Sequence, residues 1–115
     1  MPTADRLSNQ GDEAKYYVIF LRAIPGRPLT SEVVNLHADH LAELDGNRKL
    51  VLAGPVPERG MGLIVLRTAS VTEAKAIADE DPLVQGGYQT YEIGTWLLSN
   101  RDNGYHPNLG PEVHQ

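Results

Sequence analysis

Apolar residues follow two different periods along the middle of the chain. β-Branched and aromatic residues are concentrated at 16–23, 49–56, 61–69 and 88–98, and Gly, Pro, Asn or Asp interrupt the chain between these runs. Such runs predict β-strands. After the first and the third runs, apolar residues recur at spacings of three and four, which predicts an α-helix at each place. The expected order of elements is therefore β-α-β-β-α-β.

The ends of both helices carry recognisable signals. Thr30 or Ser31 can cap the first helix, and Gly46-Asn47 is a suitable stop. The second helix should begin at the capping box Ser70-Val71-Thr72-Glu73 and end at Asp81-Pro82. On this basis the domain spans residues 15–98, with an N-terminal extension at 1–14 and a C-terminal extension at 99–115.

This order fits an α+β fold of the ferredoxin-like split βαβ type, with an antiparallel four-stranded sheet. Two helices cover only one face of such a sheet. The runs 16–23 and 63–66 are nevertheless apolar at both alternating sets of positions, so the other face also needs a cover. We expect a homodimer, in which a second sheet closes a dimeric α+β barrel and the C-terminal extension is a candidate to wrap the partner.

Composition narrows the classes of function. The net charge of -5 and the absence of a Lys/Arg-rich run argue against binding to nucleic acid or an anionic membrane. The chain has no cysteine, which excludes thiolate chemistry and disulfides. No apolar leader or membrane-spanning run is recognisable, so a cytoplasmic protein with a small-molecule ligand is the expectation.

The stretch "NLHADHLAEL" places His37 and His40 on the apolar side of the first predicted helix. Three interpretations are open for this pair. The histidines could be hydrogen-bonded core residues, they could share a metal ion across one helical turn, or they could take part in catalysis. A third metal ligand is hard to find, because His106 and His114 lie in the C-terminal extension, so we expect no metal site.

Asp81 also has a structural and a functional interpretation. An Asp before Pro commonly ends a helix, and the neighbouring Asp79 and Glu80 suggest a solvated acidic run. In a split βαβ fold, however, the end of the second helix can approach the middle of the first. Asp81 could then accept a hydrogen bond from Nδ1 of His40 and orient its Nε2 as a general base.

Several motifs together resemble the YciI-like (YCII) family over about residues 16–98. They are "DHLAEL" at 39–44, "KLVLAGPVP" at 49–57 and "TASVTEAKAIADEDPLVQGGY" at 68–88. The resemblance implies a dimeric ferredoxin-like barrel with a His-Asp dyad, and it assigns the family histidine to His40 and the family aspartate to Asp81. His37 stands where relatives can carry arginine, which suggests a different substrate contact.

The resemblance also implies a reaction. Activities in such families include elimination of HCl from chlorinated hydroxyhydroquinones and isomerisation or dehalogenation of muconolactones. We expect a lyase of the dehydrochlorinase type that needs no cofactor, with His40 and Asp81 as catalytic residues. His37, Arg22, Gly54 and Pro55 are candidate substrate contacts, and a non-catalytic binding protein is the alternative. Arg27, Tyr88, Tyr91 and Trp96 are further residues that could contact a ligand.

Overall fold

The structure is a computed structural model that describes residues 15–107 and 109. The predicted N-terminal extension and most of 108–115 lie outside the described residues. The elements follow one another as β1 (Lys15–Ala23), α2 (Ser31–Gly46), β2 (Leu50–Val56), the 3-10 helix η2 (Pro57–Arg59), β3 (Met61–Thr68), α3 (Val71–Asp79), α4 (Pro82–Gln85), β4 (Gln89–Thr95) and the 3-10 helix η3 (Arg101–Asn103).

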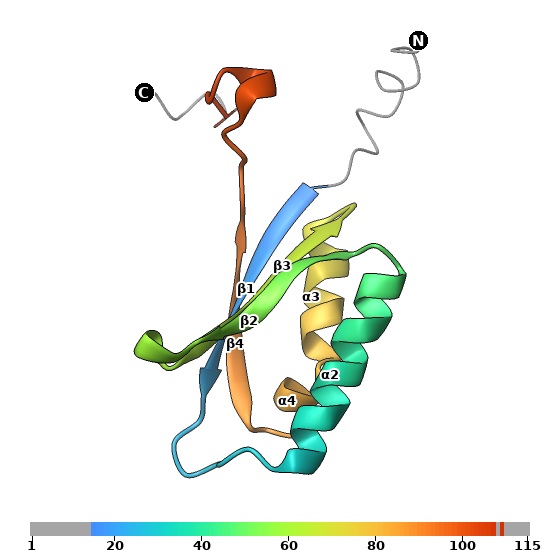
Figure 1. The fold of residues 1–115 in the computed structure, drawn as a ribbon, viewed down its shortest axis with the longest axis vertical. Coiled ribbons are helices and arrows are strands. Elements are labelled where there is room, and N and C mark those ends of the chain that lie inside the picture. Colours follow the sequence, from blue (N-terminus) through green and yellow to red (C-terminus); the bar gives the residue numbers. More distant parts are fainter. Residues whose placement is uncertain (1–14, 108, 110–115) are drawn as a thin grey trace.

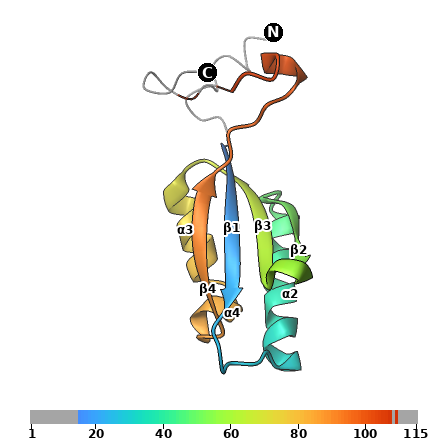
Figure 2. The same ribbon diagram turned by 90° about the vertical axis from the view of Figure 1, so that its left-hand side faces the viewer.

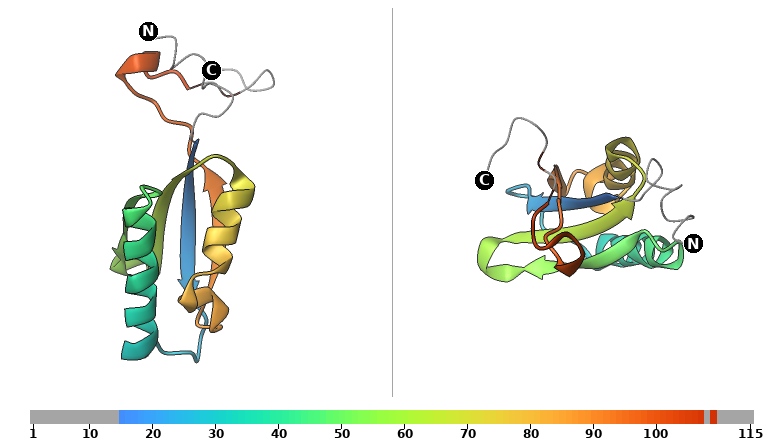
Figure 3. Two further views of the ribbon diagram at one scale, coloured as in Figure 1. Left: turned by 90° about the vertical axis from the view of Figure 1, so that its right-hand side faces the viewer. Right: turned by 90° about the horizontal axis from the view of Figure 1, so that it is seen from above.

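The four strands form one antiparallel sheet in the order β2-β3-β1-β4. β3 lies between β1 and β2, which is the split βαβ arrangement. The α-helices pack on one face of the sheet, with α2 near the β2 side and α3 and α4 near the β4 side (Figures 1 and 3). The predicted α+β ferredoxin-like fold is confirmed.

The core lies between the sheet and the helices. Alternate residues of β1 point toward the helices, and Tyr17, Ile19 and Leu21 are all buried. The helices contribute buried apolar side chains to the same core, among them Val33 and Leu44 from α2. Leu83 of α4 belongs to this cluster too, so the short helix is anchored to the domain through its own apolar side chain.

The opposite face of the sheet carries no helix of the described chain (Figure 2), and apolar side chains lie along the middle of its β1, β2 and β3 strands. Val18 lies beside Val65, and Phe20 lies beside Leu63, across the β1–β3 pair. Leu52 of β2 pairs with Val65 and is 65% exposed. An apolar sheet face of this kind normally packs against another layer.

The predicted helix starts agree closely with the structure. The Thr30 side chain accepts a hydrogen bond from the Val33 amide and caps α2. The Ser70 hydroxyl accepts from the Glu73 amide in the same way. The second half of the predicted capping box is wrong by one residue, because the Glu73 carboxylate accepts from the amide of Ala69 rather than from that of Ser70.

The chain does not simply stop being helical at Asp81-Pro82. Helix α3 ends at Asp79, and Asp81 then becomes the N-cap of α4, with Pro82 in its first turn. Pro is favourable there because the first helical amides have no partner within the helix. The predicted stop is therefore confirmed, whereas the short helix beyond it was not expected.

The last strand is shorter than the predicted 88–98. β4 ends at Thr95, and the Trp96 amide donates to the Tyr16 carbonyl before the chain leaves the sheet. Residues 96–107 then run away from the domain to η3 as a C-terminal arm (Figure 1).

In the part of the chain that the structure describes, no helix combines the length and the apolar character needed to span a membrane.

Candidate functional site

Asp81 lies between the end of α3 and the start of α4 and is almost completely buried. Only 1% of its surface is exposed. Oδ1 accepts a hydrogen bond from the Leu83 amide at 2.9 Å, the N-cap interaction of α4. A buried carboxylate needs such partners, because an ionised group without them is costly to remove from water.

The second partner of Asp81 is His37. Its Nδ1 lies 3.0 Å from Oδ1 and 2.9 Å from Oδ2 of the carboxylate. With the carboxylate ionised, Nδ1 carries the proton and donates a hydrogen bond to Asp81. In the neutral imidazole, Nε2 is then left with a lone pair. The His37 side chain is 19% exposed, so a group held by a buried carboxylate still has access to a ligand.

The predicted hydrogen bond between Asp81 and His40 is therefore wrong, because Asp81 binds His37. His40 comes three residues later, about 4.5 Å further along the helix axis. Helix α4 lies beside the N-terminal half of α2 (Figure 1), which brings Asp81 level with His37. Nε2 of His40 is buried and has no hydrogen-bond partner among the described residues.

His37 lines a pocket of about 450 Å³ between α2 and the β2–β3 hairpin. The wall opposite His37 includes Gly54 and Pro55 of β2, so the structure brings together three of the residues predicted to contact substrate. The rest of the lining is mainly aliphatic, with Leu21, Val34, Leu41 and Leu83 among its members. An apolar pocket with few polar groups is typical of small-molecule sites.

The predicted substrate contact at Arg22 is not in this pocket. Leu21 points toward the helices, so the adjacent Arg22 points to the opposite face of the sheet, where it is exposed. Arg27 has a structural partner instead. Its guanidinium donates to the Gly86 carbonyl at 2.9 Å and lies 4.5 Å from the centre of the Tyr88 ring.

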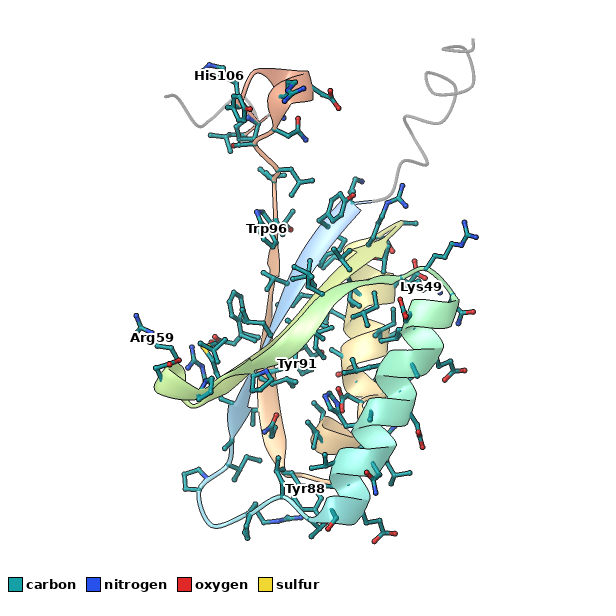
Figure 4. The ribbon with its side chains drawn as sticks, viewed as in Figure 1. Lys49, Arg59, Tyr88, Tyr91, Trp96 and His106 are labelled. Atoms are coloured by element: carbon teal, nitrogen blue, oxygen red, sulfur yellow. The ribbon has the colours of Figure 1, made fainter. Side chains whose placement is uncertain are left out.

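The three aromatic residues suggested for a pocket also lie elsewhere (Figure 4). Tyr88 stacks on Arg27, and Trp96 stands at the root of the C-terminal arm and is 46% exposed. Tyr91 lines a separate hollow at the β4 edge, and its hydroxyl donates to Asp79 at 2.7 Å. Burial, together with this hydrogen bond to a carboxylate, raises the pKa of Tyr91.

Within residues 15–107 and 109, no group of three or more His, Cys, Asp or Glu side chains could hold a metal ion.

One residue that lines the pocket was not predicted from the sequence. Gln89 is the first residue of β4 and contributes a polar side chain to the pocket of His37. The phase of the strand was the available signal, because Gln89, Tyr91 and Ile93 alternate onto the helix side of the sheet. That signal identifies the face, but it does not show that the position borders a pocket.

Comparison with known proteins agrees with this architecture. No curated protein matches the chain at a significant level. The model of the YCII-related domain matches residues 16–97, which contain the sheet except for the first residue of β1, together with the pocket, His37 and Asp81. Because this match covers most of the chain and the fold agrees with the arrangement expected from the motifs, the protein belongs to the YCII-related domain family.

Proposed function

We propose that the protein is a cofactor-independent lyase in which His37, oriented by Asp81, acts as general base. The observation that carries this proposal is the hydrogen bond between Nδ1 of His37 and the buried Asp81 carboxylate, at the wall of an apolar pocket. Asp81 fixes the tautomer and stabilises the imidazolium that forms when Nε2 takes a proton. His37 thus takes the role that the sequence had suggested for His40.

A chlorinated hydroxyhydroquinone is the substrate we propose. Nε2 of His37 removes a proton from a ring hydroxyl and, as the imidazolium, gives this proton to the carbon that bears chlorine, which produces a keto form. A second hydroxyl then loses its proton to the neutral His37, its electron pair moves into the ring, and the carbon–chlorine bond breaks. The sum is loss of HCl to give a hydroxyquinone. No external oxidant or reductant is required, because chloride leaves with the bonding electrons.

The choice of this substrate is supported by the family resemblance and by the apolar lining of the pocket. A phenolic ring is apolar over most of its surface and offers an acidic proton at its edge. Its conjugate base delocalises the charge, so no metal ion or organic cofactor is needed for the proton transfer. A muconolactone isomerase or dehalogenase is the alternative reaction within the same resemblance.

We further propose that the working form is a homodimer, in which the helix-free faces of two sheets pack together. The support is the apolar surface formed by the exposed Leu52 and the partly exposed Val18, Phe20 and Leu63. Burying such surface contributes roughly 25 cal/mol per Å² removed from water. The hydrogen bond between His37 and Asp81 lies among the helices on the other side of the sheet, so dimerisation through this face leaves it intact.

The decisive experiment replaces His37 by Asn. The side-chain amide of Asn reaches about as far as Nδ1 of His and can still donate to Asp81, but it has no basic nitrogen. Under the proposal, His37→Asn folds with nearly unchanged stability and releases chloride from a chlorinated hydroxyhydroquinone about 10²- to 10⁴-fold more slowly. Turnover is measured by ultraviolet absorbance together with chloride release.

His40→Asn is the matched control, because it makes the same chemical change one helical turn away. It should retain turnover within a few-fold of the unmodified protein. Loss of turnover in His40→Asn alone would return the role of base to His40. If neither a chlorinated hydroxyhydroquinone nor a muconolactone reacts and His37→Asn only loses stability, the His37–Asp81 pair is a structural link between α2 and α4.

A further inference from the structure

The polar side chains of the pocket are distributed sparsely. Among the lining residues that the structure describes, only His37 and Gln89 have polar side chains, and all the others are apolar residues or glycine. Gln89 is half-buried at the start of β4 and pairs with Ala23 of β1. The two polar groups therefore enter the pocket from different elements, a helix and a strand.

The side chains of the arginine residues near the pocket do not point into it. Arg22 is on the opposite face of the sheet, and Arg27 is occupied by Gly86 and Tyr88. Arg59 lies in η2, beside the lining residues Pro57 and Gly60, but it is exposed and points away from α2 (Figure 4). No lysine or arginine side chain is among the described lining residues.

This arrangement makes the charge of a ligand important. Asp81 already places one negative charge behind His37, so an anionic ligand would add a second charge in an apolar surrounding without a cation. A neutral hydroxyl compound avoids this cost. When it gives its proton to His37, the phenolate and the imidazolium form together and the total charge of the pocket does not change.

We propose that the pocket selects molecules that enter uncharged, and that Gln89 is its specificity-determining residue. The amide of Gln89 can donate to one hydroxyl or carbonyl of a ring and accept from another, while it supplies no charge to balance a carboxylate. The inference rests on the proposed function, because it concerns the same pocket. A pocket of this kind favours neutral hydroxylated rings over lactones and aromatic acids that carry a carboxylate.

The test compares two unreactive probes of similar size, 4-chlorophenol and 4-chlorobenzoate, near neutral pH. The first is neutral there and the second is an anion. Binding is followed on the full chain by the imidazole NMR signals of His37 and by calorimetry. The unmodified protein should bind the phenol at least about tenfold more tightly than the benzoate, which corresponds to about 1.4 kcal/mol.

Two variants then test whether Gln89 causes the preference for the phenol over the benzoate. Gln89→Leu should weaken binding of the phenol without admitting the benzoate, because it removes hydrogen bonds but adds no cation. Gln89→Arg should reduce or reverse the preference by about tenfold or more, because a guanidinium can pair with the carboxylate. The matched control is Asn35→Arg, which adds the same charge on the exposed side of α2, about 200° around the helix from His37, and should leave the preference unchanged.

Three results would overturn the inference: equal or tighter binding of the benzoate to the unmodified protein, equal effects of Gln89→Arg and Asn35→Arg, or no binding of either probe at millimolar concentration. Its failure is distinguishable from that of the lyase proposal. Selective binding without turnover of any hydroxyhydroquinone leaves the selectivity standing and removes the reaction. Turnover without selective binding supports the lyase reaction and removes the proposed selectivity.

Discussion

His37 and His40 lie one helical turn apart on the same side of α2, but they differ in whether a ring nitrogen has a hydrogen-bond partner. His37 binds a buried carboxylate through Nδ1, whereas Nε2 of His40 is buried without a partner in the described structure. Removing His37 takes away a partner of Asp81. Removing His40 takes away a polar atom that no described residue satisfies. The two substitutions should therefore have different energetic consequences.

We predict that His40→Leu changes the free energy of unfolding by less than about 1 kcal/mol, and that any change is as readily stabilising as destabilising. Leucine fills a similar volume and places no unsatisfied nitrogen against the core. The measurement is urea unfolding followed by circular dichroism.

His37→Leu is the comparison for that experiment. It leaves the Asp81 carboxylate buried without its imidazole partner and should cost about 1–3 kcal/mol. An equal loss in both variants would show that His40 has a structural partner of comparable importance.

At the scale of elements, the start of α3 is tied to the start of β2 through one side chain. The carboxylate of Glu73 accepts from the Ala69 amide at 3.1 Å and pairs with Nζ of Lys49 at 2.7 Å. The hydrogen bond from Lys49, followed by that from the Ala69 amide, lowers the pKa of Glu73 below its ordinary value of 4.5. Glu73 thus connects the capping of a helix to a neighbouring strand.

A pH-dependent contribution to stability follows from that lowered pKa. Because the folded-state pKa of Glu73 lies below the unfolded-state value, its contribution is fully present above the unfolded value and is lost as pH falls through the folded value. Glu73→Gln should destabilise the protein by up to about 1 kcal/mol near neutral pH, since both partners are partly exposed. The difference should vanish in acid, which urea titrations from neutral pH down to about pH 3 would measure.

Lys49→Met provides the second side of a double-mutant cycle. In that background the effect of Glu73→Gln should become smaller but not disappear, because the Ala69 amide remains a donor. A difference that grows as pH falls would contradict the assigned sign.

At the scale of the whole molecule, the α-helices cover one face of the sheet and leave the other face without a second layer. The face with Val18, Phe20, Leu52 and Leu63 is apolar, and the C-terminal arm also exposes Trp96 and Leu97. A second copy of the chain is the cover that we propose, since a two-fold contact can bury the same surface on both subunits at once.

This proposal predicts that the unmodified protein has the mass of a dimer in light scattering, and that Leu52→Glu shifts it to a monomer at the same concentration. A carboxylate in the middle of an apolar interface loses its hydration without gaining a partner. Leu36→Glu is the matched control, because Leu36 is 49% exposed on α2, away from that face, and the variant should stay dimeric. A monomeric unmodified protein would contradict the proposal directly.

The amino-acid sequence by itself determined the order of the main elements, the α+β class and most helix ends. These features depend on short-range chemistry: the period of apolar residues, the Thr30 and Ser70 caps, and the inability of Pro82 to continue α3. The same local information placed both histidines on one side of α2 and indicated that Asp81 could approach that helix.

Only the tertiary structure decided which histidine Asp81 meets and which residues share the pocket. His37 and His40 lie on the same side of the helix, about 60° apart on its circumference, and the choice between them depends on where the short helix α4 packs along α2. That offset is fixed by contacts between residues 44 positions apart, such as His37 and Asp81, and no local pattern records it. For the same reason Gln89 joins the pocket and Arg22 does not: strand alternation sets the face, but the packing of α2 against the hairpin creates the pocket itself.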